Sequence, residues 1–204
     1  GLDRIYNNFV YDFLYPNPAS VLAFIENHDT DRFLGEGNNL PMLKQASTLL
    51  LTTRRIPQLY YGTEVMMNGV KSKSDGYVRK DFPGGWTGDA TNALTPAGRT
   101  KIQNECYDFY KTILNWRKGN DVIAKGSMVQ FMVQNGVYAY ARQYEGKTIF
   151  VMLNGTDAET TVPLKFYKEI LKNSKQGKDI LSGKAITFGE ELKMGPRESL
   201  VIEL

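Results

Sequence analysis

The sequence predicts two parts of different fold class, an α/β part followed by a small all-β part. Up to about residue 120, short apolar runs alternate with segments of helical periodicity. From Gly126 onward, apolar residues recur at every second position, and turn pairs such as Asn-Gly separate the runs. We therefore assign residues 1–122 to the α/β part and residues 123–204 to an antiparallel β-sandwich.

Composition excludes several classes of protein. The 204 residues are 42% hydrophobic and 23% charged, which is typical of folded globular chains. The net charge is +3 and basic residues alternate with acidic ones, so nothing supports nucleic-acid binding. No apolar run approaches the roughly 20 residues that cross a bilayer. The single cysteine, Cys106, excludes an internal disulfide and a cysteine-rich zinc site.

The first predicted elements are a short helix and a buried strand. Apolar side chains follow helical spacing over residues 2–14, and Pro16 ends that segment. The run VLAFI at residues 21–25 stands between a Pro/Asn/Ser turn and the polar cluster ENHDTDR. A continuous apolar run of this length is typical of a strand buried on both faces, here with functional groups at its C-terminal end.

A second helix and a second strand follow. Asn39 is a suitable helix N-cap, and the apolar face continues to Thr53 before two arginines that favour a helix C-terminus. The run QLYY at residues 58–61 is the next predicted strand, and it ends at Gly-Thr-Glu. Strand, helix and strand with such short connections predict a right-handed βαβ unit, so both polar clusters should lie at one sheet edge. Ligands bind at that edge in such folds.

Residues 66–93 form a long glycine-rich segment without periodicity, which is either a functional loop or a disordered one. Thr95 and Pro96 then open a strong helix that ends at Gly119. In the all-β part, Asn135-Gly136 predicts a type I′ hairpin turn, because both residues readily adopt positive φ angles. The further predicted strands are TIFVML, TTVPL, KAITF and SLVIEL.

The only histidine, His28, ends the first predicted strand beside Asn27 and Asp29. A lone histidine is often structural, but its place at a binding edge makes a functional role for His28 as well supported as a structural one. The nearby carboxylates match no metal-binding spacing, so we predict no metal site. The sequence contains no G-x-S-x-G elbow and no glycine-rich nucleotide motif. Trp86, on the long loop, either stacks on a sugar or packs locally.

Two motifs identify a family that the chain resembles. FIENHD at residues 24–29 and IPQLYYGTE at residues 56–64 resemble the motifs that end the seventh and eighth barrel strands of the α-amylase family of glycoside hydrolases. DGYVRKDFPGGW at residues 75–86 and DILSGK at residues 179–184 are similar to its neopullulanase and cyclomaltodextrinase-like branch. The resemblance covers essentially the whole chain. It implies the C-terminal part of a (β/α)8 TIM barrel, about its last two strands, followed by a β-sandwich.

The resemblance also implies roles for individual residues. Asp29 corresponds to the family's third essential carboxylate, which stabilises the transition state. His28 and Asn27 are expected to bind hydroxyls of the reacting glucosyl unit, and Arg79 and Trp86 to hold substrate from the long loop. In the family, a nucleophilic Asp ends strand four and an acidic Glu ends strand five, and neither motif is found in this sequence.

We therefore expect part of a retaining α-glucan hydrolase that is inactive in isolation, with starch, maltooligosaccharides or cyclodextrins as substrates. The expected partners are an α-glucan oligosaccharide and the missing N-terminal barrel segment, or another copy of the chain, because an isolated pair of barrel strands exposes its edges. No cofactor is expected in this chain. Calcium is common in the family, but its usual ligands lie upstream. Cysteine usage leaves the compartment open, and a bacterial periplasmic or secreted location is favoured over the cytoplasm.

Two other functions stay open at this point. The chain could be a carbohydrate-binding or interaction module without catalysis, or a structural domain whose motifs have decayed. The sequence decides neither the linkage that is cleaved nor the preference for cyclic or linear glucans. An Asp-bearing fourth-strand motif and a Glu-bearing fifth-strand motif upstream in the same reading frame would establish the hydrolase.

Overall fold

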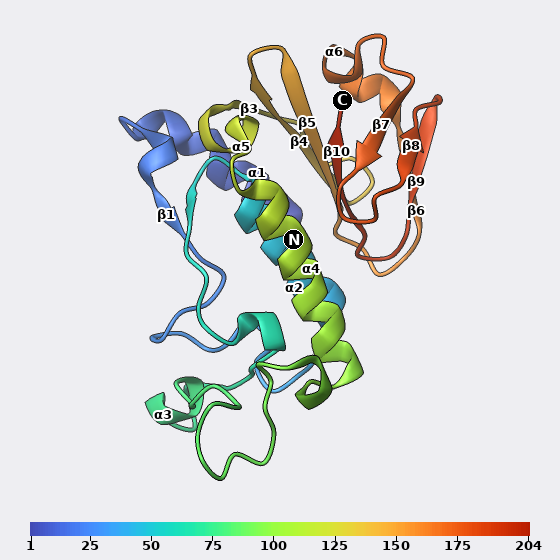
Figure 1. The fold of residues 1–204 in the computed structure, drawn as a ribbon. Helices are drawn as coiled ribbons and strands as arrows, with labels where there is room; N and C mark the ends of the chain where they lie inside the picture. The colour runs from blue at the N-terminus through green and yellow to red at the C-terminus, as the bar shows by residue number, and fades with distance from the viewer.

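The computed structural model describes residues 1–204 and has a helical half and a sheet half (Figure 1). The helices are α1 (Leu2–Val10), α2 (Leu40–Thr52), α3 (Asp75–Val78), α4 (Lys101–Arg117), α5 (Asp121–Lys125) and α6 (Lys168–Leu171). The strands are β1 (Leu22–Ala23), β2 (Ile56–Pro57), β3 (Ser127–Gln130), β4 (Val137–Tyr144), β5 (Lys147–Asn154), β6 (Thr160–Pro163), β7 (Gln176–Asp179), β8 (Ala185–Thr187), β9 (Glu191–Met194) and β10 (Ser199–Glu203). No helix is long and apolar enough to cross a membrane.

The centre of the molecule is the helix pair α2 and α4, which lie side by side (Figure 1). The Asn39 side chain caps α2 by accepting from the Met42 N–H at 3.1 Å, as the sequence predicts. Thr100 and Gln103 form a capping box at the start of α4. Between the helices lies a small apolar core, formed mainly by Leu40, Leu43, Leu51, Cys106, Tyr110 and Ile113.

Two helix boundaries differ from those expected. Thr95 caps a separate 3-10 turn over Pro96–Gly98, and α4 begins only at Lys101, because Thr100 supplies the stronger cap. The two arginines predicted to favour the C-terminus of α2 lie beyond its last residue. Both form ion pairs with the buried carboxylate of Asp12, so their charges hold the 3-10 turn after α1.

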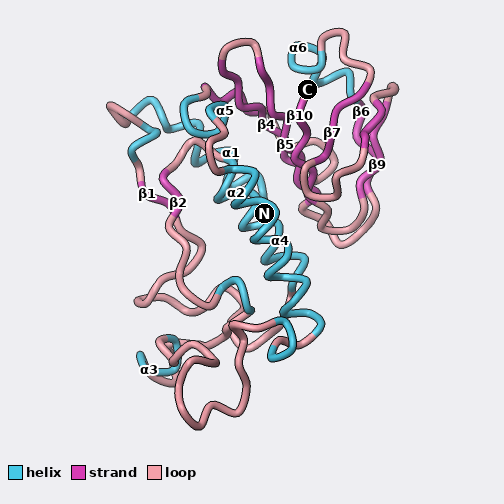
Figure 2. The backbone as a smooth tube through the Cα atoms, viewed as in Figure 1, coloured by secondary structure: helices cyan, strands magenta, loops and turns pink.

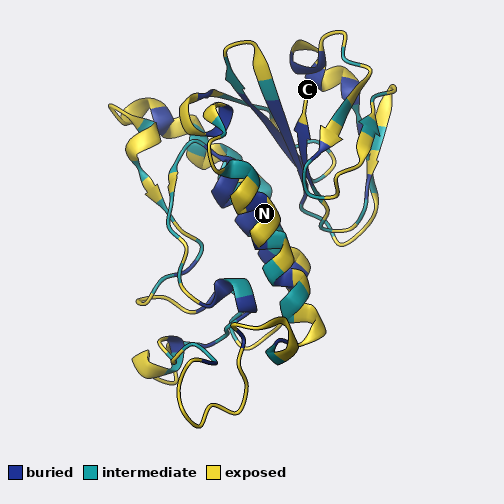
Figure 3. Cartoon of the chain, viewed as in Figure 1, coloured by how far each residue is buried: buried dark blue, intermediate teal, exposed yellow.

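The strands β1 and β2 pair in parallel, as the βαβ pattern predicts, but they are much shorter than expected. The prediction of a strand buried on both faces over residues 21–25 is wrong, since Leu22 is 54% exposed and Phe24 is 43% exposed. The reason is that β1 and β2 form a sheet of only two strands, and this chain does not cover both of its faces. In Figure 3 this region is largely exposed or intermediate.

The strand predicted over residues 58–61 is also wrong. The backbone leaves the pairing with β1 after Gln58, whose N–H still donates to the Ala23 carbonyl at 2.8 Å. Thr63 then starts a 3-10 turn, Thr63–Val65, directly after Gly62, which has a φ of 81°. The left-handed conformation of Gly62 turns the chain out of the strand direction.

The all-β part is built from two sheets. β3, β4, β5, β10, β7 and β8 form one antiparallel sheet in that order, and β6 and β9 form the second. Side chains such as Phe150, Val162 and Met194 fill the core between them. The opposite face of the large sheet packs on the helical half through Tyr138, Tyr140 and Val151. The large sheet is therefore covered on both faces, which explains why every residue from Val137 to Arg142 is buried.

The predicted Asn135-Gly136 hairpin is confirmed. Asn135 has a φ of 51° and Gly136 a φ of 77°, and the flanking Gln134 and Val137 exchange both backbone hydrogen bonds. β7 and β9 have no counterpart among the predicted strands. In each strand, exposed residues alternate with half-buried or buried ones, and lysine and acidic residues are frequent. No apolar run therefore predicts either strand.

Buried polar contacts join the two halves. The Arg142 guanidinium on β4 donates to the carbonyls of Thr52 at 3.0 Å, Ile123 at 2.9 Å and Gly126 at 2.8 Å. Burial lowers the pKa of Arg142 to about 10, which still leaves it charged at neutral pH. The carbonyls of α2, α5 and the segment before β3 therefore meet on one side chain of the sheet.

The segment between β2 and α4 is mostly loop (Figure 2). Its first part is tied to the body, since Val78 is fully buried and Gln103 on α4 donates to the Val65 carbonyl at 3.0 Å. Residues 85–92 are all exposed. The first part is therefore anchored at buried points such as Val65 and Val78, while residues 71–76 and the 85–92 tip are exposed.

We expect limited proteolysis to cut within residues 66–93, at the exposed 85–92 tip, before it cuts the sheet domain. Chymotrypsin, with Trp86 as its target, and mass spectrometry of the first fragments provide the measurement. The buried β4 strand serves as the internal control. An early cut within residues 129–142 with the loop intact would contradict this expectation.

Candidate functional site

The polar cluster at the end of β1 forms a tight turn. The Asn27 side-chain oxygen accepts from the Asp29 N–H at 2.8 Å, and the Asn27 N–H donates to the Thr30 hydroxyl at 3.1 Å. Such side-chain contacts to nearby backbone are typical of asparagine in turns. The turn leaves the His28 and Asp29 side chains more than half exposed. Both side chains are therefore accessible to a ligand, and Asn27 stabilises the turn that exposes them.

Three of the predicted site residues contact one another. His28 Nε2 lies 3.1 Å from Asp29 Oδ2, and Arg79 Nη2 lies 3.0 Å from Asp29 Oδ1. Arg79 Nε also donates to the His28 carbonyl at 2.9 Å. Each carboxylate oxygen of Asp29 therefore faces a different nitrogen, one from its own turn and one from the long loop. This arrangement orients the carboxylate and places cationic character beside it.

Trp86 stands apart from this cluster. Its side chain is 71% exposed, and its backbone N–H donates to the Asp89 carboxylate at 3.0 Å. No hydrogen bond joins it to His28, Asp29 or Arg79. The structure thus brings together four of the five residues predicted from sequence and leaves Trp86 on the open loop.

Beneath the exposed cluster lies a buried ion pair that the sequence reasoning missed. Arg32 Nη1 lies 3.1 Å from Glu26 Oε1, and both side chains are almost completely buried. Glu26 also accepts from the Thr63 hydroxyl and from the Phe33 N–H, each at 2.5 Å. The Thr63 contact joins the ends of β1 and β2 at one edge, as the βαβ pattern predicts.

The sequence contained a signal for this pair. Glu26 directly follows an apolar run, and Arg32 closes the same ENHDTDR cluster that contains His28 and Asp29. A charge beside an apolar run is usually solvated, and which of several charges is buried depends on the surrounding fold. The pattern alone therefore could not separate Glu26 and Arg32 from Asp31, which stays exposed.

Other reactive groups do not extend the site. No three His, Cys, Asp or Glu side chains of the chain converge to hold a metal ion. Cys106 is fully buried in α4, and burial raises the pKa of its thiol to about 12. A neutral, inaccessible thiol is a poor nucleophile, which agrees with the absence of a cysteine-catalysis motif.

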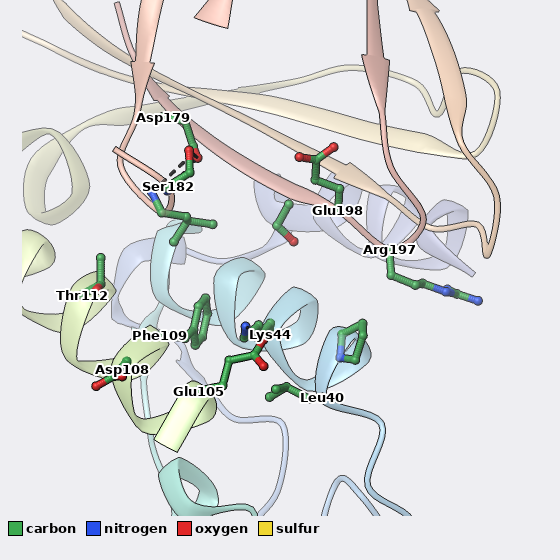
Figure 4. Close-up of a pocket in the computed structure, with 13 residues that line it drawn as sticks. Leu40, Lys44, Glu105, Asp108, Phe109, Thr112, Asp179, Ser182, Arg197 and Glu198 are labelled. Carbon is green, nitrogen blue, oxygen red and sulfur yellow. Dashed lines mark hydrogen bonds and ion pairs between the residues drawn. The ribbon is translucent and has the colours of Figure 1, made fainter. Parts of the chain in front are cut away.

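A cleft of about 410 Å³ lies elsewhere, between the helix pair and the sheet half (Figure 4). Several of its charged side chains are already partnered: Lys44 binds Glu105 at 2.6 Å, and Asp179 accepts from the Ser182 hydroxyl at 2.6 Å. Neither His28, Asp29 nor Arg79 lines it. The cleft is an interface between the two halves, and the strand-end cluster remains the candidate site.

Known proteins are similar to this chain over most of its length. Residues 128–203 match the family described as the cyclo-malto-dextrinase C-terminal domain. An α-amylase of Niallia circulans is 30% identical over 93% of this chain and 32% of its own length. A cyclomaltodextrin glucanotransferase of Thermoanaerobacterium thermosulfurigenes is 30% identical over 96% of this chain and 25% of its own length. The chain thus spans between a quarter and a third of these curated relatives.

The fold of this chain is also similar to that of solved α-amylase structures. The crystal structure of an Anoxybacillus α-amylase superposes with a TM-score of 0.74 over 99% of this chain and 42% of that protein, at 22% identity. That identity supports a shared fold and no finer statement. Together these matches confirm what the FIENHD and IPQLYYGTE motifs indicated: this chain is similar, over nearly its whole length, to the C-terminal part of α-amylase-family glycoside hydrolases.

Proposed function

We propose that this chain supplies the substrate-binding and transition-state-stabilising side of a retaining α-glucan hydrolase site. The observation that carries the proposal is the contact of His28, Asp29 and Arg79 at the edge where two parallel strands end. The similarity to α-amylases and cyclomaltodextrin glucanotransferases supports an α-glucan as the ligand. The match of residues 128–203 supports the cyclomaltodextrinase-like branch, with starch, maltooligosaccharides or cyclodextrins as substrates.

In this proposal Asp29 acts on the transition state. As a glucosyl ring flattens toward an oxocarbenium ion, hydrogen bonds from its hydroxyls to a fixed carboxylate strengthen. The Asp29 carboxylate is held from both sides by His28 and Arg79, so it does not have to be reoriented during the reaction. His28 Nδ1 makes no hydrogen bond within the chain, and it is the ring nitrogen we assign to a sugar hydroxyl.

The catalytic pair of a retaining glycosidase is a nucleophile and an acid about 5 Å apart across the scissile bond. The carboxylate nearest to Asp29 through Arg79 is Asp75, whose Oδ2 lies 3.0 Å from the same Arg79 Nη2. Both carboxylates are salt-bridged to one guanidinium, which is not the arrangement of a nucleophile and an acid facing each other. We therefore propose that those two groups come from outside these 204 residues.

We further propose that residues 1–122 are the last two strands and helices of a (β/α)8 barrel and that residues 123–204 are the sandwich domain. The exposed apolar side chains around α1 and β1 support this assignment, because a barrel would cover them. They include Val10, Tyr11, Phe13, Leu14, Leu22 and Phe24. A missing N-terminal barrel segment is the first choice for the cover, and a second copy of the chain is the alternative. Calcium belongs to the longer enzyme in this proposal.

The purified 204-residue chain is expected to release no reducing sugar from soluble starch, maltooligosaccharides or pullulan, because the covalent route lacks both reacting groups. A reducing-sugar assay over many hours, with an active α-amylase as the positive control, provides the measurement. Activity that survives re-purification and is abolished by Asp29→Asn would contradict the proposal.

A binding module without catalysis is the second candidate, and the 71% exposure of Trp86 favours it. An exposed indole is a suitable platform for a sugar ring. Titration with maltotriose separates the two candidates. Loss of binding on Trp86→Ala, with no change on Asp29→Asn, favours the binding module. The reverse pattern favours the strand-end site.

A further inference from the structure

We propose that Arg32 is the positioning residue that docks the 67–81 segment on the end of β1, so that Arg79 reaches Asp29. This inference rests on the proposed function for the role of Asp29, although the docking itself is independent of that function. Arg32 does not reach the exposed cluster. It acts on Asp29 through the backbone of the long loop.

The guanidinium of Arg32 binds three structural units at once. Nη1 donates to the Tyr61 carbonyl at 2.7 Å and pairs with Glu26 at 3.1 Å, which joins the segments that follow β2 and β1. Nε donates to the Val78 carbonyl at 3.0 Å. Val78 is the residue directly before Arg79, so this bond holds the backbone from which the Arg79 side chain starts.

The same segment is also held through the backbone of Arg32. The Arg32 N–H donates to the Gly69 carbonyl at 3.0 Å, and the Gly69 N–H donates to the Gly35 carbonyl at 2.7 Å. A Cβ atom at Gly69 would meet the Tyr77 carbonyl oxygen at 2.6 Å. The start of the segment and its return past Tyr77 are therefore packed backbone against backbone, and only glycine leaves room for that approach.

The docking decides what Arg79 can reach. The Arg79 side chain is 39% exposed, yet it binds Asp29 Oδ1 and Asp75 Oδ2 and also donates to the His28 carbonyl. A long, partly exposed side chain holds such a geometry only when its backbone is fixed, because its rotamers are otherwise free. Val78, fully buried beside Arg32, provides that fixed point.

The chemistry of Arg32 fits a positioning role better than a stabilising one. Its Nη2 is buried without a hydrogen-bond partner, and a buried ion pair adds little net stability. Lysine carries the same charge, but its three N–H donors share one nitrogen, which cannot stand in for both Arg32 Nη1 at Glu26 and Tyr61 and Arg32 Nε at Val78. The planar fork of arginine is what the geometry requires.

Hydrogen exchange measured by mass spectrometry on the 204-residue chain tests the docking. Arg32→Lys is expected to raise exchange over residues 75–81 by about tenfold, while exchange in β4 and β5 is unchanged. Gly69→Ala keeps every charge and is expected to give the same local rise in exchange over residues 75–81. It is the second variant to measure if Arg32→Lys fails to fold. Unchanged exchange over residues 75–81 in both variants, or a uniform rise that includes β4 and β5, would overturn the proposal.

Maltotriose titration then tests the link to the site. Arg79→Met is expected to weaken binding by about tenfold or more. Arg32→Lys should weaken it as much, and the double variant no further, because both changes remove the same contact to Asp29. Additive losses would overturn the positioning role. If the unmodified chain does not bind maltotriose while the local exchange effect is present, the proposed function fails and the docking of Arg79 by Arg32 stands.

Discussion

Asp29→Ala is expected to lower kcat by several orders of magnitude in an active enzyme that contains this chain. The carboxylate is held by His28 and Arg79 and acts on the transition state more than on the bound substrate, so its loss should affect kcat rather than KM. His28→Ala should cost less. With its Nε2–H facing Asp29, the neutral His28 ring accepts from a sugar hydroxyl at Nδ1, and such a hydrogen bond contributes about 1 to 3 kcal/mol, which corresponds to about a 10- to 100-fold loss of kcat/KM.

Asp75→Asn is the matched control for this experiment, because Asp75 binds the same Arg79 nitrogen but is not assigned to the reaction. It should leave kcat within about tenfold of the unmodified enzyme. Kinetics and melting temperature are measured on the same preparations. An Asp29→Ala enzyme that melts earlier but keeps its kcat would refute the catalytic role and assign Asp29 to the stability of the strand end.

Glu26→Ala is expected to give the largest loss of stability. It leaves the Arg32 guanidinium charged and buried, and it removes the acceptor for Thr63 and for the Phe33 N–H. Breaking a buried pair by removing one partner costs about 3 to 5 kcal/mol of unfolding free energy. For a chain of this size, such a loss corresponds to a fall in melting temperature of about 10 °C or more.

Glu105→Ala provides the comparison. Glu105 pairs with Lys44 at 2.6 Å, but the Glu105 side chain is 58% exposed, so the pair should contribute less than about 1 kcal/mol. Both variants are unfolded by heat and by urea, with circular dichroism as the readout. If Glu26→Ala costs no more than Glu105→Ala, then removing the partner of the buried Arg32 charge carries no penalty and this expectation is wrong.

The features that the sequence predicts well depend on neighbouring residues along the chain. The Asn39 cap and the Asn135-Gly136 turn are local hydrogen-bond and φ preferences that any fold must satisfy. The parallel pairing of β1 and β2 follows from the crossover through α2, because two parallel strands need such a connection. The wrong start of α4 has a local cause as well, since Thr95 and Thr100 are both good caps and Thr100 also has Gln103 three residues later.

The prediction that residues 21–25 are buried on both faces depended on distant residues, and it failed. An apolar run at residues 21–25 is buried only if other elements cover both faces, and in this chain Leu22 and Phe24 stay exposed. By contrast, β4 is buried throughout because helices and a second sheet cover its two faces. The exposed run VLAFI is entirely apolar, whereas the buried run VYAYAR at residues 137–142 contains Arg142, so apolar composition does not predict which run is buried.

By itself, the sequence determined the Asn39 cap and the helices α2 and α4, the Asn-Gly hairpin, the resemblance carried by its two motifs, and the neighbourhood of Asn27, His28 and Asp29. The cap, the hairpin and this neighbourhood follow from contacts within a few residues. Only the tertiary structure decided that Glu26 and Arg32 are the buried charges of the cluster and that Arg79, 50 residues further along the chain, binds Asp29. The physical reason is that burial and long-range ion pairs depend on which surfaces meet, and Arg79 meets Asp29 from a loop whose Val78 carbonyl accepts from Arg32.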